Sequence, residues 1–157
     1  IGLEHKGKIV AGVIYEAAKD ELFWAEKGEG AWLNESRLRV SARSRMLEAI
    51  FATGVPFAGH RDLPNTLADL ARLMPACAGV RRWGSAALDM AYVAAGRYEG
   101  FWERSLNAWD VAAGEIIVKE AGGLIETVTG EGSVVETGDV LCANEAIFEK
   151  FAGVIRG

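Results

Sequence analysis

Cysteine and long apolar runs are scarce in this 157-residue sequence. Only two cysteines occur, Cys77 and Cys142, which lie far apart in apolar surroundings. This pattern is typical of buried thiols in a reducing compartment, with a disulfide or a catalytic thiol as the alternative. No apolar run approaches the roughly 20 residues of a membrane span, and no basic amino end precedes an apolar core. The sequence therefore predicts neither a membrane span nor a signal peptide.

Positive charge is also in short supply. The 17 Lys and Arg residues against 22 Asp and Glu residues give a formal net charge of −5, and no basic cluster stands out. This balance argues against direct binding to nucleic-acid phosphates. Hydrophobic residues make up 50% of the chain, which excludes a disordered protein, and a chain of this length can fold around one core. We expect a cytoplasmic protein of the α/β or α+β class.

Several well-known site motifs are missing. The sequence has no Cys/His metal spacing, P-loop, nucleophile elbow or Gly-rich dinucleotide fingerprint, which disfavours kinases, serine hydrolases and NAD enzymes. His5 and His60 have no partner in the sequence, so both are predicted to be surface residues.

Residues 1–40 have the pattern of an antiparallel meander. The segments 1–5 and 9–16 flank a short Gly-containing link, which predicts a hairpin. From residue 41 onward, short strands alternate with helices, a pattern that favours a twisted sheet, mostly parallel or mixed, with helices on its faces. The predicted strands are 49–53, 80–83, 100–103, 124–126 and 140–143, and the predicted helices are 63–74, 85–95, 111–121 and a last helix that Asn144 caps. In the first helix, the spacing predicts a buried face of Leu63, Leu67, Leu70, Ala71 and Met74.

Two carboxylates follow the predicted strand 100–103. Glu103 ends the strand and Asp110 falls in the first turn of the next helix, so both lie where open α/β sheets bind ligands. The helix dipole favours an ionised Asp110, and such an oxygen suits Mg²⁺. The alternatives are a simple helix cap for Asp110 and a solvated side chain for Glu103.

A second strand-to-helix passage contains Gly84, Ser85 and Ala86. Small residues let a ligand approach the backbone, and the helix start offers free N–H donors. The alternative is a plain Ser N-cap after a flexible Gly. Asp89, one turn further, is explained by compensation of the helix dipole.

Three stretches together resemble the inositol monophosphatase family. They are the run from Gly84 to Arg97, the run Trp109-Asp110-Val111-Ala112-Ala113-Gly114, and Glu120-Ala121-Gly122-Gly123 at the helix end. Thr53-Gly54-Val55-Pro56-Phe57 also fits, and the match looks most like the bacterial extragenic-suppressor (SuhB-type) branch. The resemblance implies Mg²⁺-dependent hydrolysis of a small phosphate monoester such as inositol 1-phosphate. It further implies that Asp110 is a metal ligand, that Glu103 binds inositol hydroxyls, and that Gly84, Ser85 and Ala86 contact the inositol ring.

The family's Asp-Pro-x-Asp-Gly-Thr motif and its upstream Glu do not occur in the sequence, and Ile1 reads as the middle of a strand. We therefore expect the C-terminal part of the family's αβαβα sandwich, with the N-terminal half of the fold absent. Residues 1–45 would form a strand meander of the first sheet, and residues 46–157 the C-terminal α/β layer. Such a chain is expected to be inactive alone.

Other activities stay open at this point. Relatives within the same superfamily act on fructose bisphosphate, histidinol phosphate or a 3′-phosphonucleotide. The SuhB-type branch is associated with transcription and ribosomal RNA processing, which offers a non-catalytic interaction role. A homodimer is expected from the resemblance.

Overall fold

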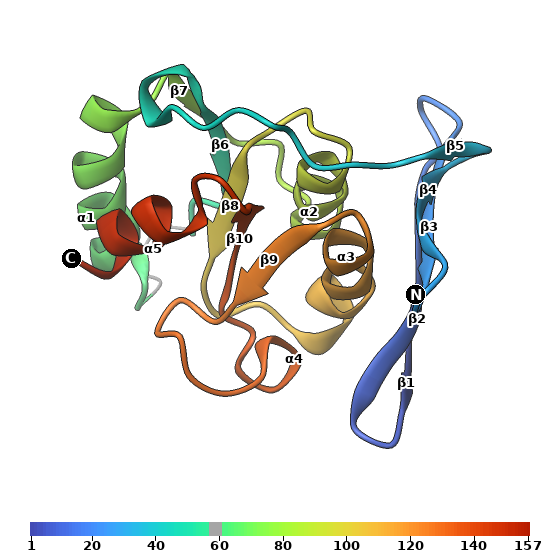
Figure 1. Cartoon of the computed structure of the whole chain (residues 1–157). Helices are drawn as coiled ribbons and strands as arrows, with labels where there is room; N and C mark the ends of the chain where they lie inside the picture. The colour runs from blue at the N-terminus through green and yellow to red at the C-terminus, as the bar shows by residue number, and fades with distance from the viewer. Residues whose placement is uncertain (57–60) are drawn as a thin grey trace.

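The computed structural model describes residues 1–56 and 61–157. Four layers follow one another across the molecule: α1 and α5, the five-stranded sheet formed by strands after residue 49, α2 and α3, and the five-stranded sheet formed by strands within residues 2–37 (Figure 1). Phe57 and His60, which the sequence placed in a motif and at the surface, lie outside the described residues. Two sheets and a helical layer between them match the expected C-terminal part of an α/β sandwich.

The first sheet is an antiparallel meander, as predicted. Its strands pair in chain order: β1 (Gly2–His5), β2 (Lys8–Glu16), β3 (Glu21–Glu26), β4 (Gly30–Leu33) and β5 (Ser36–Arg37). Lys6 and Gly7, with φ of 51° and 72°, form the tight turn of the first hairpin. Alternation along the strands turns Ile14, Phe23 and Ala31 toward the helical layer, where all three are buried.

The second sheet is mixed, which is one of the two arrangements that the sequence predicted. Its strand order is β7 (Gly79–Arg81), β6 (Ile50–Thr53), β8 (Gly100–Glu103), β10 (Val140–Asn144) and β9 (Gly123–Glu126). The pairs β7–β6 and β6–β8 are parallel, whereas β8–β10 and β10–β9 are antiparallel. The reason lies in the connections: α3 carries the chain from β8 to β9, and no long helix separates β9 from β10, so β10 returns antiparallel between them.

Five helices in the described part of the chain complete the fold. They are α1 (Leu63–Leu73), α2 (Ala86–Ala94), α3 (Ala108–Glu120), α4 (Val134–Thr137) and α5 (Phe148–Arg156), with two 3₁₀ turns at Met46–Glu48 and Met74–Ala76. Asn144 accepts the N–H of Ile147 at 3.1 Å, so it closes the turn ahead of α5 instead of capping the helix itself. None of the helices within the described ranges is long and apolar enough to cross a membrane.

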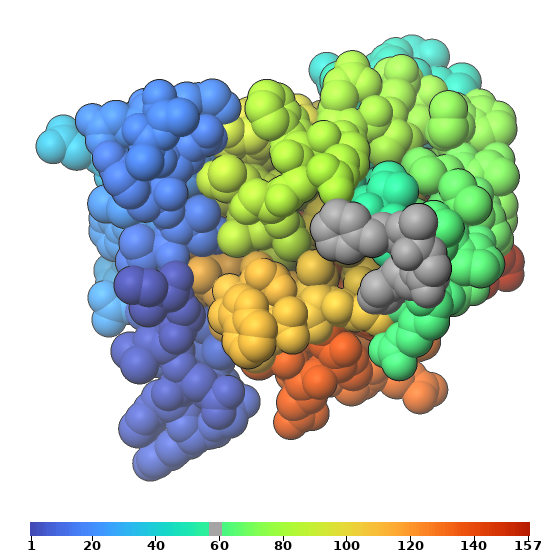
Figure 2. Space-filling view, turned by 180° about the vertical axis from the view of Figure 1, so that it is seen from behind, coloured from blue at the N-terminus to red at the C-terminus, as the bar shows by residue number. Residues whose placement is uncertain are grey.

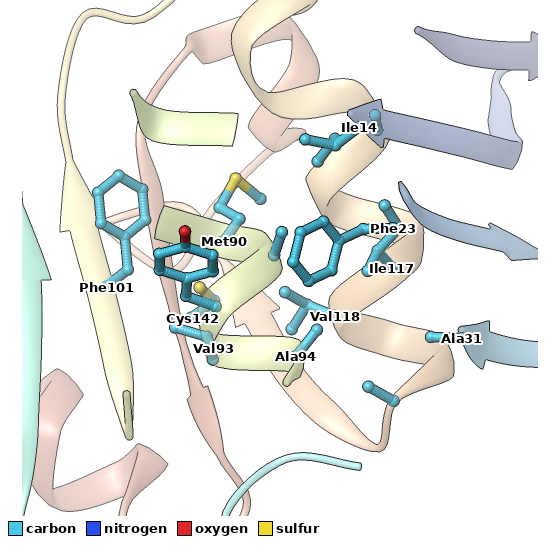
Figure 3. Close-up of a cluster of buried hydrophobic side chains, with 14 of the residues drawn as sticks. Ile14, Phe23, Ala31, Met90, Val93, Ala94, Phe101, Ile117, Val118 and Cys142 are labelled. Atoms are coloured by element: carbon cyan, nitrogen blue, oxygen red, sulfur yellow. The ribbon is translucent and has the colours of Figure 1, made fainter. Parts of the chain in front are cut away.

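Alternation along β8 divides the interior into two cores. Phe101 faces the helical layer, and Trp102 faces α1 and α5. Figure 3 shows how side chains from both sheets meet α2 and α3 in the first core; the labelled set is Ile14, Phe23, Ala31, Met90, Val93, Ala94, Phe101, Ile117, Val118 and Cys142. Cys142 is a fully buried free thiol, as predicted, while Cys77 is free and half-buried.

The buried face of α1 differs from the predicted one. Thr66, Asp69 and Leu73 are buried, whereas Leu67 and Met74 are exposed. Asp69 explains the rotation, because its carboxylate accepts the indole N–H of the buried Trp102 at 3.1 Å. A buried carboxylate must keep such donors, so this bond decides which side of α1 faces the sheet.

Polar contacts fasten the first sheet to the helical layer. Glu120, in the last turn of α3, accepts the backbone N–H groups of Gly28 and Gly30 at 2.9 Å each. Arg97 binds both carboxylate oxygens of Glu21 at 2.6 and 2.7 Å. These charge-assisted bonds fix the meander relative to α2 and α3.

Candidate active site

A cavity of about 420 Å³ opens where β6 and β8 end and α2 and α3 begin. The start of α2 (yellow-green) and the start of α3 (yellow-orange) lie beside each other on this face of the molecule (Figure 2). The cavity contains every residue that the sequence selected for a site: Gly84, Ser85, Ala86, Glu103 and Asp110. The structure therefore brings together two segments that are separate in the sequence, at the strand ends where α/β folds bind ligands.

Glu103 is the last residue of β8 and is half-buried. Its side chain lies against Gly54, which directly follows the parallel neighbour β6, and a Cβ at position 54 would overlap the Glu103 carboxyl group. Burial raises the pKa of Glu103 to about 7; the positive charge of Arg82 opposes this shift and the charge of Asp110 adds to it. Glu103 can therefore exchange a proton near neutral pH.

Asp110 is the third residue of α3 and therefore lies in its first turn, as the sequence predicted, although the helix begins earlier than expected, at Ala108. Its Oδ2 accepts the backbone N–H of Asn107 at 3.0 Å, so the carboxylate does cap the helix. Capping does not exclude a ligand, since a carboxylate has more acceptor sites than one N–H bond uses. The cap fixes Asp110 at the cavity wall.

Gly84 and Ser85 form the entry to α2. Gly84 has a φ of 89°, a backbone conformation that favours glycine, and Ser85 caps the helix by accepting the N–H of Leu88 at 3.4 Å. The N-cap alternative is thus correct for the Ser85 side chain. The remaining N–H groups at the helix start lie beside the cavity, where they suit a polar or anionic ligand.

From the sequence, Asp89 was explained by the helix dipole alone. That explanation misses the burial of its side chain. The residue is 1% exposed, and its Oδ1 has no hydrogen-bond partner among the described residues. Burial raises the pKa of Asp89 to about 7, with a further upward contribution from the charge of Glu103 and a downward one from Arg82. One sequence signal could have found it: Asp89 is the only charged residue in the helix Ala86–Ala94, and all the other residues of that helix are hydrophobic.

Arg82 and Gly54 also line the cavity, and the sequence assigned neither of them a role in a site. Arg82 places a positive charge that lowers the pKa of both Asp89 and Glu103. Gly54 leaves room for the Glu103 carboxyl group, because it has no side chain. Neither role is visible in a local pattern, because both depend on strands that meet only in the folded chain.

The described residues do not form a complete magnesium site. Mg²⁺ takes close to octahedral oxygen coordination, and Glu103 and Asp110 bring two carboxylates to one cavity. Within residues 1–56 and 61–157, however, no group of three or more His, Cys, Asp or Glu side chains is placed to hold a metal ion. These carboxylates can therefore provide only part of a metal site.

The layered fold, with a carboxylate-lined cavity at its strand ends, defines an α/β protein. The model of the inositol monophosphatase family matches residues 1–156, so the chain belongs to that family. The resemblance found in the sequence motifs is thereby confirmed.

Individual relatives agree with this assignment. The chain is 47% identical over 156 residues to a protein of Rhizobium meliloti named inositol-1-monophosphatase, covering 99% of this chain and 59% of that protein. It is 41% identical over 158 residues to the Nus factor SuhB of Pseudomonas aeruginosa, covering 99% of this chain and 58% of that one. The crystal structure of the extragenic suppressor protein suhB from Bartonella henselae superposes with a TM-score of 0.94 at 45% identity, covering 99% of this chain and 60% of that one. The chain thus spans about three-fifths of the length of these relatives.

Proposed function

We propose that this chain forms part of a Mg²⁺-dependent phosphatase that acts on inositol monophosphate or a similar small phosphate monoester. One observation carries the proposal: Glu103, Asp110 and the start of α2 line a single cavity of about 420 Å³. A hydroxyl-rich substrate needs carboxylate acceptors and backbone donors at close range, and this cavity offers both. Family membership and the similarity to a relative named inositol-1-monophosphatase support the same activity.

Each residue then has a distinct role. Glu103 accepts hydrogen bonds from substrate hydroxyl groups, and Gly54 leaves the space in which its carboxylate lies. Gly84, Ser85 and Ala86 orient the ring of the substrate, mainly through backbone N–H groups at the start of α2. Asp110, held by its capping bond, provides an oxygen ligand for Mg²⁺.

The metal would neutralise charge on the phosphate when bound, but Asp110 alone cannot hold it. A single carboxylate leaves most of the coordination sphere of Mg²⁺ to water, and phosphoryl transfer depends strongly on the positioning of metal and phosphate. We therefore expect the 157-residue chain to release no phosphate from inositol 1-phosphate above background. A phosphate-release assay in millimolar Mg²⁺ measures this directly.

A chimaera makes the positive test. The part of the Rhizobium meliloti protein that has no counterpart in this chain would be joined to the chain, and Mg²⁺-dependent hydrolysis of inositol 1-phosphate measured. We expect activity, which Asp110→Asn abolishes and which Glu103→Gln reduces mainly through a higher KM. Glu145→Gln is a matched control, because Glu145 is exposed and does not line the cavity. A folded chimaera that is inactive, or Asp110→Asn with full activity, would overturn the proposal.

A second candidate is an interaction role, favoured by the relatives of 40–41% identity that are named Nus factor SuhB. In that role, surface residues matter more than Asp110. The chimaera separates the two: a variant with Asp110→Asn that loses hydrolysis but still complements loss of a SuhB relative would support the interaction role. The homodimer expected from the resemblance stays a prediction, which sedimentation equilibrium would test.

A further inference from the structure

A second groove, of about 500 Å³, lies on the side of the molecule where α1, α5 and the loop after β9 meet. Among the described wall residues, three are arginines and Asp69 is the only acidic one. The walls consist of Asn65, Ala68, Asp69, Arg72, Arg104, Val128, Thr129, Ile155 and Arg156. A concentration of positive charge is unexpected in a chain with a net charge of −5.

The arginines are held in place by bonds that use only part of each guanidinium group. Arg72 donates through Nε to the carbonyl of Val154 at 2.9 Å and through Nη2 to Ile155 at 2.8 Å. Arg156 donates through Nε to Val128 at 2.9 Å and through Nη2 to Glu126 at 2.7 Å. Within the described part of the chain, the Nη1 groups of Arg72 and Arg156 make no hydrogen bond, so each keeps two N–H donors.

Asp69 cancels only part of this charge. Its Oδ1 accepts from Arg72 at 2.6 Å, and its Oδ2 accepts from Trp102 at 3.1 Å and from Arg104. The carboxylate is 1% exposed, so both oxygens are already occupied inside the protein. With Glu126 paired to Arg156 at the rim, three cations stand against two anions, which leaves the groove with one excess positive charge.

We propose that this groove binds a phosphate group, either as free inorganic phosphate or as the phosphate of a small monoester. Guanidinium groups stay charged at all relevant pH values, and their planar N–H pairs match phosphate oxygens. Arg72 and Arg156 are anchored to backbone carbonyls, so little of their side-chain entropy is lost on binding. The Asn65 side chain adds a neutral polar group to the wall.

The groove is separate from the candidate active site. Arg104 is the one residue that lines both cavities, and the other wall residues of the groove belong to α1, α5 and the loop after β9. The proposal does not depend on the proposed function, since it needs neither Glu103 nor Asp110.

Two substitutions on α1 make a matched test. Ala68 and Ala71 are both exposed on α1, but only Ala68 lines the groove. Ala68→Glu places a carboxylate beside the arginines without removing any of their structural bonds, whereas Ala71→Glu makes the same chemical change outside the groove. Binding of inorganic phosphate and of glycerol 2-phosphate to the full chain would be measured by ¹H–¹⁵N NMR titration at constant ionic strength in EDTA.

We expect saturable binding of at least one of the two probes, with shifts at residues of the groove. Ala68→Glu should weaken the affinity about tenfold, because the new negative charge competes for the guanidinium groups, and Ala71→Glu by less than about twofold. Tighter binding of inorganic phosphate would identify the free ion as the ligand, and tighter binding of glycerol 2-phosphate the ester. Equal affinities of the two variants, or no saturable binding of either probe, would overturn the proposal.

Discussion

The two sheets of this protein contain equal numbers of strands but differ in how they are covered. The second sheet has helices on both faces, and its neighbouring residues Phe101 and Trp102 are both fully buried although they point to opposite sides. Within residues 1–56 and 61–157, only one face of the first sheet is covered. On its outer face, Val13 is 39% exposed and Tyr15 is 55% exposed, whereas Ile14 between them is buried.

This difference predicts how each sheet responds to mutation. In a sheet that is buried on both faces, every side chain has packed neighbours, so truncation leaves a cavity. In a one-sided sheet, only alternate residues have that environment. Truncation of a side chain should therefore lower the free energy of unfolding at every position along the strands of the second sheet. In the first sheet, it should do so only at alternate positions, where the side chain faces the helical layer.

Trp102→Ala should have the largest effect. In the second core, the indole packs against the ring of Phe151, with 5.8 Å between the ring centroids. Its N–H donates to the Asp69 carboxylate at 3.1 Å. Its removal opens a large cavity and takes one donor from a buried carboxylate, so we expect a loss of about 3–5 kcal/mol in the free energy of unfolding. Urea denaturation followed by circular dichroism measures this. A loss below about 1 kcal/mol would show that the second core is not closely packed.

Gly12→Ala tests the contact between the first sheet and the helical layer. A Cβ at position 12 would lie 2.7 Å from the carbonyl oxygen of Ala113 and 2.7 Å from Cγ2 of Ile116 on α3. Because backbone cannot move aside, we expect a loss of about 2–3 kcal/mol. Gly153→Ala is the control: nothing lies near its Cβ position in α5, so the same change should stabilise the protein by about 0.5–1 kcal/mol. Equal signs for the two substitutions would contradict this account of the interface.

Much of this fold follows from local sequence patterns. The hairpin at Lys6 and Gly7 and the strand before Glu103 come from signals within a few residues. The position of β10 between β8 and β9 was not predicted, since strand pairing joins residues that are distant in the sequence. The buried face of α1 was predicted wrongly for a related reason: Asp69 is buried only because Trp102, on another element, provides its partner.

The candidate site also contains residues that local sequence patterns predicted and residues that they did not. Asp110 and Ser85 could be placed at helix starts from capping patterns alone, and the structure brings both to one cavity. Asp89 and Arg82 influence that cavity through charge and burial, quantities that exist only after folding. The metal-binding and substrate-binding roles of these residues stay predictions.

Asp89→Asn examines the helical layer that both sheets share. The pKa of Asp89 is raised from 3.8 to about 7, so the folded state keeps a proton that the unfolded state releases between these values. The contribution of this group to stability is therefore complete below pH 4 and is lost as the pH rises through 7. Asn cannot ionise, so between pH 5 and pH 8 the wild type should lose about 2 kcal/mol more unfolding free energy than the variant. Urea denaturation at both pH values, with the exposed Glu145→Gln as a control, measures the difference; parallel pH profiles of wild type and Asp89→Asn would contradict it.

Trp24→Ala should have the smallest effect, although it removes the same side chain as Trp102→Ala. Trp24 lies on the outer face of the first sheet, directly opposite Trp32 on β4. The two rings are stacked, with 5.8 Å between their centroids. Its indole N–H donates to the carbonyl of Asn34 at 3.1 Å, an exposed bond that water can replace. Because the ring is only half-buried and has no helix above it, no closed cavity forms, and we expect a loss of about 1 kcal/mol, the value of one stacked pair and one exposed bond. Urea denaturation of Trp24→Ala beside Trp102→Ala makes the comparison with one residue type. A loss of about 3 kcal/mol or more at Trp24 would show that the outer face of the first sheet is covered in solution and that the two sheets are equivalent.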